Sequence, residues 1–272
     1  MANIVFERKI YDKMLAWKQE RQGKTALLIK GARRIGKSTI VRTFAGREYK
    51  SYILIDFSMA SKAVTDLFED LMNLDFIFLR LQSIYQVVLE KRKSVIIFDE
   101  VQLCPKARQA IKHLVADGRY DYIETGSLIS IKKNVANIII PSEETRLEMY
   151  PMDFEEFCWA LGLKDKMEYM CQDLQQNNLF KDELTDAFWQ YMAVGGMPRA
   201  VVEWLDSKNM AAVDEVLTGI LHSYRNDFSK HTDPLQAERF HQILMLISYR
   251  FFFYPFTPVC ATPSINCFWK IM

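Results

Sequence analysis

The sequence predicts an α/β fold in which a parallel β-sheet covered by helices is followed by a smaller all-helical domain. Short apolar runs alternate with helical patterns up to about residue 150, which is typical of a parallel sheet buried on both faces. Beyond Pro151 the strand-like runs disappear, and residues 154–246 read as successive helices with one clear interruption at "VGGMP". We therefore expect a core over 1–150, a helical domain over 151–245 and an atypical tail over 246–272.

The elements of the core are expected in a regular order. An amphipathic helix over residues 6–22 comes first, because its apolar residues recur at helical spacing. Short apolar runs predict strands at 25–30, 52–57, 94–100 and 120–127. Helical patterns predict helices at 38–45, at 63–90 in two pieces divided near Asn73, and from Pro105 to Gly118.

The composition narrows the class of protein. The chain has 272 residues and a net charge of +1, so its charge gives no argument for a nucleic-acid or acidic partner. Its five cysteines are scattered and contain no C-x-x-C pair, which predicts reduced thiols in a cytoplasmic protein and neither a disulfide framework nor a zinc site. The most apolar stretch, residues 244–260, contains Arg250 and two prolines, so we expect no membrane span.

The stretch "LLIKGARRIGKSTIVRTF" carries a phosphate-binding pattern. Gly31, Gly36, Lys37 and Ser38 match G-x-x-x-x-G-K-S/T, with an apolar strand before the loop and a helix after it, a context that disfavours a chance match. Glycines let the backbone wrap a phosphate closely, the lysine supplies a cation for the β- and γ-phosphates, and the serine hydroxyl can ligate Mg²⁺. The predicted nucleotide-binding residues are Gly31, Ala32, Arg33, Arg34, Ile35, Gly36, Lys37, Ser38 and Thr39.

The strand "SVIIFDE" ends in two acids whose positions suit phosphate chemistry. Asp99 is the predicted partner of Ser38 at Mg²⁺, and Glu100 is the predicted base that deprotonates the attacking water. Small-molecule kinases have no need of such a base, so the pair favours hydrolysis over transfer to a metabolite. The alternative is an acidic strand end that faces solvent.

One predicted strand separates the phosphate-loop strand from the Asp-Glu strand in sequence. This is the order of additional-strand P-loop NTPases, in which a further strand is inserted between those two in space. The 120–127 strand ends in Thr125, Gly126 and Ser127, and a hydroxyl there would lie beside the γ-phosphate. We predict a sensor role for Thr125 or Ser127 without choosing between them, the alternative being that Ser127 only caps a following helix.

The arginines are weaker candidates for stabilising the charge on the γ-phosphate. Arg33 and Arg34 lie within the loop, and Arg146 precedes the predicted domain boundary, where it is a candidate arginine finger in cis or in trans. A surface position is the favoured interpretation of all three. Lys106, Arg108 and Lys112 share one predicted helix and are expected on its solvated face, the alternative being contact with phosphates.

These motifs together resemble a family of prokaryotic AAA-type ATPases. The resemblance rests on "RKIYDKMLAWKQE", "GARRIGKST", "IIFDEVQ", "IETGS", "YPMDFEEF" and "YMAVGGMPRAV", in that order over residues 7 to about 240. In that family the ATPase core is followed by helices and a C-terminal domain of unknown function, sometimes compared with restriction-endonuclease-like folds. The resemblance implies ATP as the nucleotide, Lys37 and Ser38 at phosphate and Mg²⁺, Asp99 at the metal and Glu100 at the water. No N-K-x-D base-reading motif of GTPases is visible, which agrees with ATP.

The end of the chain departs from the family. After "RFHQI" the resemblance implies a polar helical continuation, whereas residues 246–272 are rich in aromatic residues and poor in charge. We interpret this tail as a truncation or frameshift, the alternative being a genuine apolar tail that packs on the helical domain.

The function predicted from the sequence is Mg²⁺-dependent ATP binding and hydrolysis that drives a conformational switch. The alternative is a nucleotide-dependent binding module with negligible turnover. A protein or nucleic-acid partner stays unidentified, a homo-oligomer is compatible with the sequence, and a cytoplasmic location without membrane contact is expected.

Overall fold

The computed structural model describes residues 4–127, 143–172, 181–231 and 239. The chain divides into two compact units, Met1–Pro151 and Met152–Met272, each described by itself below. The predicted tail after residue 245 and the position of a helix starting at Leu128 lie outside the described residues.

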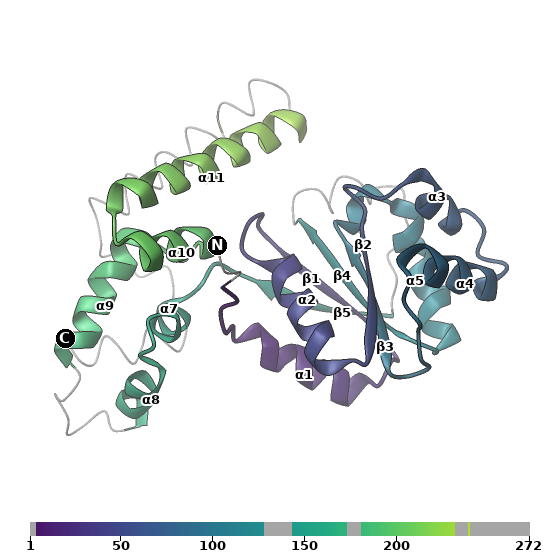
Figure 1. Ribbon diagram of the computed structural model, residues 1–272, viewed down its shortest axis with the longest axis horizontal. Coiled ribbons are helices and arrows are strands. Elements are labelled where there is room, and N and C mark those ends of the chain that lie inside the picture. The colour runs from purple at the N-terminus through teal and green to yellow at the C-terminus, as the bar shows by residue number, and fades with distance from the viewer. Residues whose placement is uncertain (1–3, 128–142, 173–180, 232–238, 240–272) are drawn as a thin grey trace. The chain divides into compact units, whose positions relative to one another are not determined.

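The first unit is built on a sheet of five parallel strands (Figure 1). Their bounds are β1 (Ala26–Gly31), β2 (Ser51–Asp56), β3 (Ser94–Asp99), β4 (Asp121–Ser127) and β5 (Glu144–Met149). The spatial order is β2-β3-β4-β1-β5, and every neighbouring pair is parallel. β4 therefore lies between β1 and β3, as the additional-strand order predicts, and the predicted α/β fold class is confirmed.

Helices cover both faces of this sheet. One face carries α1 (Ile10–Arg21) and α2 (Lys37–Glu48). The other carries α3 (Lys62–Thr65), the 3₁₀ turn η1 (Asp66–Phe68), α4 (Leu74–Tyr85) and α5 (Pro105–Asp117), which follows the 3₁₀ turn η2 (Val101–Leu103).

Local sequence signals explain most of these helix ends. The Asn73 side chain accepts a hydrogen bond from the amide of Phe76 and caps α4, and Gly118 ends α5 in the left-handed region at φ 72°. The predicted helical run to residue 90 is wrong at its end. α4 stops at Tyr85 because Gln86 adopts φ 53°, which cannot continue a right-handed helix.

Strand β5 was not predicted from the sequence. Its residues, "ETRLEM", alternate charged with uncharged side chains and contain no apolar run, and within the described sheet the strand pairs only with β1. A parallel edge strand has one hydrogen-bonded neighbour, so it needs less apolar surface than a central strand.

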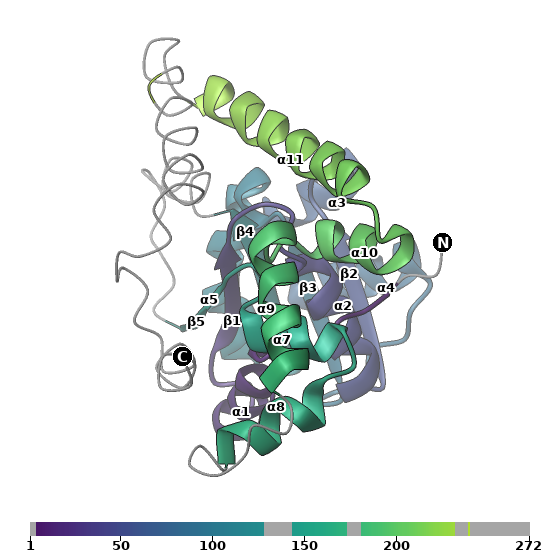
Figure 2. The same cartoon turned by 90° about the vertical axis from the view of Figure 1, so that its left-hand side faces the viewer.

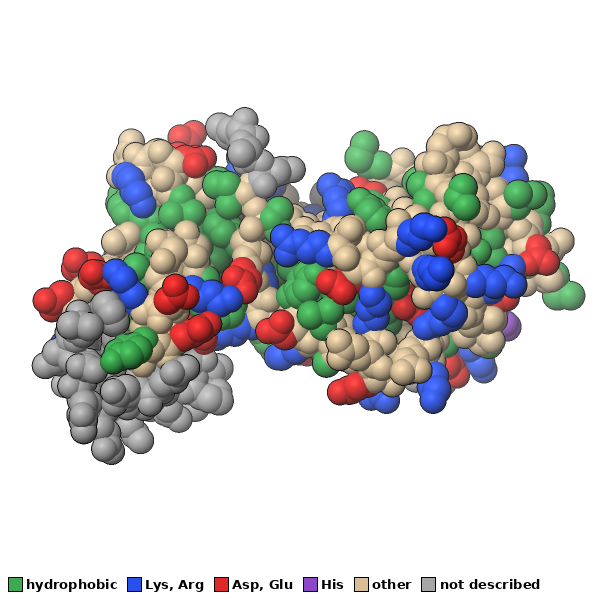
Figure 3. Space-filling view, turned by 60° about the horizontal axis from the view of Figure 1, so that its bottom comes forward, with side chains coloured by type: hydrophobic (Ala, Val, Ile, Leu, Met, Phe, Trp, Pro, Cys, Tyr) green, Lys and Arg blue, Asp and Glu red, His purple; other side chains and the backbone are tan. Residues whose placement is uncertain are grey.

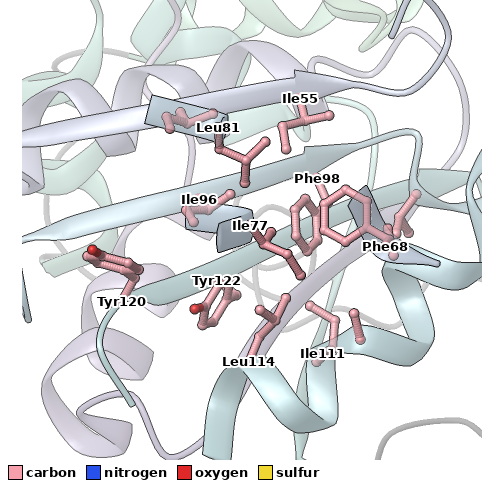
Figure 4. Close-up of a cluster of buried hydrophobic side chains, with 14 of the residues drawn as sticks. Ile55, Phe68, Ile77, Leu81, Ile96, Phe98, Ile111, Leu114, Tyr120 and Tyr122 are labelled. Atoms are coloured by element: carbon pink, nitrogen blue, oxygen red, sulfur yellow. The ribbon is translucent and has the colours of Figure 1, made fainter. Parts of the chain in front are cut away.

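The core on the α5 side of the sheet is apolar and aromatic. Figure 4 shows strand side chains pointing toward helix side chains across this layer. The labelled residues come from β2, β3 and β4 (Ile55, Ile96, Phe98, Tyr122), from η1, α4 and α5 (Phe68, Ile77, Leu81, Ile111, Leu114) and from the position just before β4 (Tyr120). The rings of Phe68 and Phe98 meet edge to face with centroids 5.5 Å apart. Because both faces of the sheet are buried, its central strands β1 and β3 read as continuous apolar runs.

Arg108 lies inside the fold, which corrects the prediction that it faces solvent. Its Nη1 donates to Glu124 Oε2 at 3.1 Å and its Nη2 donates to Glu144 Oε2 at 2.9 Å. Arg146 donates from Nε to the other oxygen of Glu144 at 2.6 Å. Helical periodicity places Arg108 on the buried face of α5 together with Ile111, and the two carboxylates make that position tolerable.

This network predicts a pH dependence of stability. Burial raises the pKa of Glu124 from 4.5 to about 8, with Arg108 opposing and Glu144 reinforcing the shift. Between these values the folded chain holds a proton that the unfolded chain releases, so the free energy of unfolding falls as pH rises, by at most about 1.4 kcal/mol per pH unit. Urea unfolding of the wild type and Glu124→Gln at about pH 6, 7 and 8 measures this slope. Equal slopes in the two proteins would contradict the assignment.

In the described residues of the second unit every element is a helix. They are α7 (Phe154–Ala160), α8 (Lys164–Gln172), α9 (Lys181–Val194), α10 (Pro198–Ser207) and α11 (Met210–His231). α7 begins with a capping box in which Asp153 and Glu156 satisfy each other's backbone amides. α10 and α11 contact each other (Figure 2).

The "GGMP" break between α9 and α10 has a packing role. Gly195 adopts φ 75°, and Gly196 accepts a hydrogen bond from the amide of Met152 at 2.7 Å. A Cβ at Gly196 would meet the Met152 carbonyl oxygen at 2.0 Å, so only glycine fits there. The turn at Gly195 and Gly196 thus packs against Met152, the first residue of the second unit.

None of the helices in the described ranges combines the length and the apolar character that crossing a membrane requires. Figure 3 shows basic and acidic side chains mixed over one face, in keeping with the near-neutral net charge.

Candidate functional site

The loop between β1 and α2 depends on two glycines. A Cβ at Gly31 would meet the carbonyl oxygen of Met149 at 2.3 Å, so β1 can approach the end of β5 only without a side chain there. Gly36 adopts φ 95° immediately before α2, a conformation that L side chains rarely reach. The loop therefore turns sharply and delivers the amino terminus of a twelve-residue helix to the carboxyl edge of the sheet.

Lys37 is the first residue of α2, and its side chain folds back over the loop. Its Nζ donates to the carbonyl oxygens of Gly31 at 3.1 Å and Ala32 at 2.7 Å. Burial lowers the pKa of Lys37, while the charges of Glu100 and Asp99 act in the opposite direction. The ammonium group is thus buried among neutral carbonyls, and a phosphate oxygen would be a stronger acceptor than either.

Three segments meet at the carboxylate of Asp99, which is the last residue of β3. Ser38 Oγ donates to Asp99 Oδ1 at 2.9 Å, and Thr125 Oγ1 donates to the same oxygen. The amide of Glu100 donates to Thr125 Oγ1 at 3.3 Å. Residues from α2, β3 and β4 that lie far apart in the sequence are therefore within hydrogen-bond distance of one another.

The donor set at this point consists of hard oxygen ligands. The described residues contain no group of three or more His, Cys, Asp and Glu side chains arranged to hold a metal ion. A hydroxyl and one carboxylate fit Mg²⁺, which keeps several waters and takes its other ligands from phosphates. The pair Ser38 and Asp99 therefore fits a magnesium ion that arrives with a nucleotide, and does not fit an all-protein metal cage.

Glu100 has an unusual backbone conformation. Its φ of 53° lies in the left-handed region, where a residue with a side chain is uncommon, and it starts the turn η2. Its carboxylate is half-buried and accepts a hydrogen bond from the side-chain amide of Gln102. Such conformations occur where a site requires a side chain in a fixed direction.

Thr125 and Ser127, the two alternatives at the end of β4, have different surroundings. Thr125 reaches Asp99 and the Glu100 amide, whereas Ser127 is buried in register with Gly31. The structure thus brings Thr125 to the Asp99 carboxylate and the Glu100 amide, and leaves Ser127 beside the start of the loop.

A protein-family model described as "AAA domain" matches residues 23–158, half of the chain. The chain belongs to the AAA domain family. A second model, described as "Domain of unknown function (DUF8612)", matches residues 185–251. The two matches agree with the resemblance drawn from the sequence, an AAA-type core followed by a domain of unknown function. Membership supports nucleotide binding by the AAA domain in general.

Solved structures resemble the AAA domain chain at low identity. C. elegans PCH-2 matches with 12% identity and a TM-score of 0.44, over 79% of this chain and 70% of that one. The Thermotoga maritima RuvB Holliday junction branch migration motor matches with 13% identity and a TM-score of 0.43, over 78% and 69%. Aeropyrum pernix Orc1, solved in complex with DNA, matches with 13% identity and a TM-score of 0.42, over 84% and 68%. No inference about binding or assembly follows from likenesses at this level. A search of curated proteins found no match.

The structure adds one residue to the site of the AAA domain that the sequence did not indicate. Arg8 is buried just before α1, and its Nη1 donates to the carbonyl of Ile35 in the phosphate loop at 3.0 Å. Its Nη2 donates to the carbonyl of Tyr150 after β5 at 2.7 Å. Arg8 thus ties the loop to the end of the edge strand. The only sequence signal was its place in the family segment "RKIYDKMLAWKQE".

The other loop residues and arginines have mixed surroundings. Ile35 is fully buried, whereas Ala32, Arg34 and Thr39 are exposed, and Arg34 adopts φ 64°. The charge of Arg33 lowers the pKa of Lys37. Arg146, the candidate finger, pairs with Glu144 on the sheet three positions before the end of β5.

Proposed function

We propose that this AAA domain hydrolyses ATP in the presence of Mg²⁺. The observation that carries the proposal is the convergence of the Ser38 and Thr125 hydroxyls on one carboxylate oxygen of Asp99, with Lys37 and Glu100 beside it at the carboxyl edge of the sheet. Parallel α/β sheets bind ligands at this edge. Family membership supports nucleotide binding, and the residues supply the groups that phosphoryl transfer to water needs.

Each group has a definite task in this proposal. The loop from Gly31 to Ser38 holds the β- and γ-phosphates, and Lys37 exchanges its two carbonyl partners for phosphate oxygens. Ser38 and Asp99 hold Mg²⁺, which when bound neutralises charge on the phosphate oxygens. Glu100 accepts a proton from water as the water oxygen bonds to the γ-phosphorus. The bond between that phosphorus and the bridging oxygen breaks, giving ADP and inorganic phosphate.

The same contacts suggest how the cycle drives a conformational change. Ser38 and Thr125 both use Asp99 Oδ1 as their acceptor. Metal and phosphate need that oxygen and the Ser38 hydroxyl, so their binding requires the Ser38 and Thr125 hydroxyls to leave Asp99 Oδ1. Loss of the γ-phosphate restores the hydroxyl contacts. We propose this exchange as the local switch.

A nucleotide-dependent binding module is the second candidate. The Gln102 side-chain amide donates to one oxygen of the Glu100 carboxylate and fixes its direction, and a carboxylate held out of line with the attacking water would leave that water unactivated. If the contact persists in the nucleotide-bound protein, ATP is held and turnover is negligible.

Phosphate release from purified protein separates the two candidates. With Mg-ATP we expect steady release of inorganic phosphate, lost when EDTA removes the metal and restored by excess Mg²⁺. ATP binding is measured in the same samples. Binding without release, even in concentrated protein, would reject hydrolysis in favour of the binding module, and absence of both would reject the proposed site.

Arg8 provides a test of the loop as a nucleotide site. Arg8→Met removes two donors from backbone carbonyls, so we expect a loss of stability of about 3–6 kcal/mol, because hydrogen bonds to charged groups are worth about 1.5–3 kcal/mol each. We also expect ATP to bind about tenfold more weakly, because Ile35 loses its anchor. Denaturant unfolding and ATP titration measure both. Lys13→Met, exposed on the same segment, should change neither, and unaltered affinity in Arg8→Met would contradict a role for the anchor.

A further inference from the structure

We propose that Arg108 is a positioning residue for the phosphate site. By bridging Glu124 and Glu144 it fixes the end of β4, which carries Thr125, relative to the segment that carries Asp99 and Glu100. This inference rests on the proposed ATP hydrolysis and deepens it, because it assigns the geometry of the site to a group that touches neither nucleotide nor water.

The bridge has a defined shape. The two terminal nitrogens of Arg108 donate to one oxygen of Glu124 and one of Glu144, at 3.1 Å and 2.9 Å, and the three side chains are at most 2% exposed. A guanidinium presents its donors in a rigid planar fork, so it fixes the directions as well as the distances of two acceptors. A lysine at the same position would supply one movable point charge.

The bridge joins the two halves of the site. Glu124 immediately precedes Thr125, and successive residues of a strand point to opposite faces, so Glu124 faces α5 while Thr125 reaches Asp99. Arg108 lies in the first turns of α5, which follows Asp99 and Glu100 after the short turn η2. Sliding β4 along its axis would move Thr125 from Asp99 and would break the bridge at the same time.

Stability alone does not account for this arrangement. In the described part of the chain, Arg108 Nε and Glu124 Oε1 are buried without a hydrogen-bond partner. Buried ionic groups can often be replaced by apolar residues of similar size without loss of stability, or with a gain. Departures from the rule that buried polar atoms are paired are expected at functional sites. The unpaired oxygen here belongs to Glu124, one residue before Thr125 of the proposed site.

The opposite end of β4 offers a matched control. Asp121 is also buried there, and it accepts hydrogen bonds from the Tyr49 hydroxyl and from Arg92, each at 2.8 Å. This second polar contact lies at the amino end of the strand, away from Thr125. Tyr49→Phe removes a buried hydrogen bond on the same strand without touching the site.

The test compares turnover with stability in the full chain. The triple variant Arg108→Met, Glu124→Leu, Glu144→Leu should have an equal or higher Tm, a KM for ATP within about twofold of wild type and a kcat about tenfold lower. Arg108→Lys, which keeps the charge but loses the planar fork, should show the same kcat loss. This variant provides the test in case the triple variant does not fold. Glu124→Gln, which keeps the acceptor oxygen, and Tyr49→Phe should retain kcat within about twofold.

The outcomes distinguish this inference from the proposed function. If the wild type hydrolyses ATP and a folded triple variant or Arg108→Lys keeps the wild-type kcat, the positioning role is overturned and hydrolysis stands. An equal kcat loss in Tyr49→Phe would also overturn it, because any buried bond on β4 would then suffice. If the wild type releases no phosphate, the proposed function fails and this inference fails with it.

Discussion

Glu100→Gln is expected to bind ATP like the wild type and to release phosphate about 10²–10⁴ times more slowly. The substitution keeps the size of the side chain and its capacity to contact Gln102, but removes the carboxylate that takes the proton from water. General-base catalysis contributes a factor of this size. Single-turnover phosphate release and equilibrium ATP binding, measured on the same samples, report the two properties separately.

The control for Glu100 is Glu69→Gln. Glu69 is an exposed acid of the first unit that pairs with Lys106, and its replacement should leave both binding and turnover unchanged. If Glu100→Gln retained more than about a tenth of wild-type turnover, Glu100 would not be the base. A loss of binding together with turnover would instead point to a structural role for the left-handed residue.

Lys37→Ala is expected to weaken ATP binding by at least about a hundredfold. Each hydrogen bond from an ammonium group to a charged acceptor is worth about 1.5–3 kcal/mol, and about 1.4 kcal/mol corresponds to a tenfold change in affinity. The variant should fold at least as stably as the wild type, because burial already disfavours the charged form of Lys37 and lowers its pKa. Fluorescent nucleotide titration and thermal unfolding measure the two effects.

Lys24→Ala is the matched control for Lys37. Lys24 is exposed just before β1. Its substitution by alanine therefore removes the same charge from the same unit without altering the loop. ATP binding by Lys24→Ala should equal that of the wild type. Equal affinities of Lys37→Ala and the wild type would reject the loop as the phosphate site, and equal losses in both variants would indicate an effect of overall charge.

The fold class and the phosphate loop could be predicted because they depend on short-range patterns. An apolar run, two glycines and a helical pattern from Ser38 are all visible within twenty residues, and the fold class is confirmed. β4 could be placed beside β1 because the order of strands is shared by additional-strand proteins. Roles for the individual site residues stay predictions until the variants are measured.

What the sequence did not reveal depends on tertiary neighbours. β5 lacks an apolar run and pairs only with β1 within the described sheet. Arg108 looked like a surface residue of its helix because its two partners, on β4 and β5, are distant in the sequence. Arg8 contacts two backbone carbonyls, and such contacts leave no pattern in side-chain types. Thr125 and Ser127 are two positions apart and point to the same face of the sheet. The choice between them required the register of β4 against β3, in which Phe98 pairs with Glu124, and the sequence does not give that register.

The pairing of β1 has a consequence for the order in which the chain can fold during synthesis. Leu27 pairs with Ile123, and Ala26 pairs with Glu144, so the strand that carries the phosphate loop leaves the ribosome long before either neighbour exists. β2 and β3 are closer in sequence and can pair first. Distant pairings pay a larger loop-closure entropy and form late. The nucleotide loop is therefore among the first parts of the core to be translated and among the last to be built.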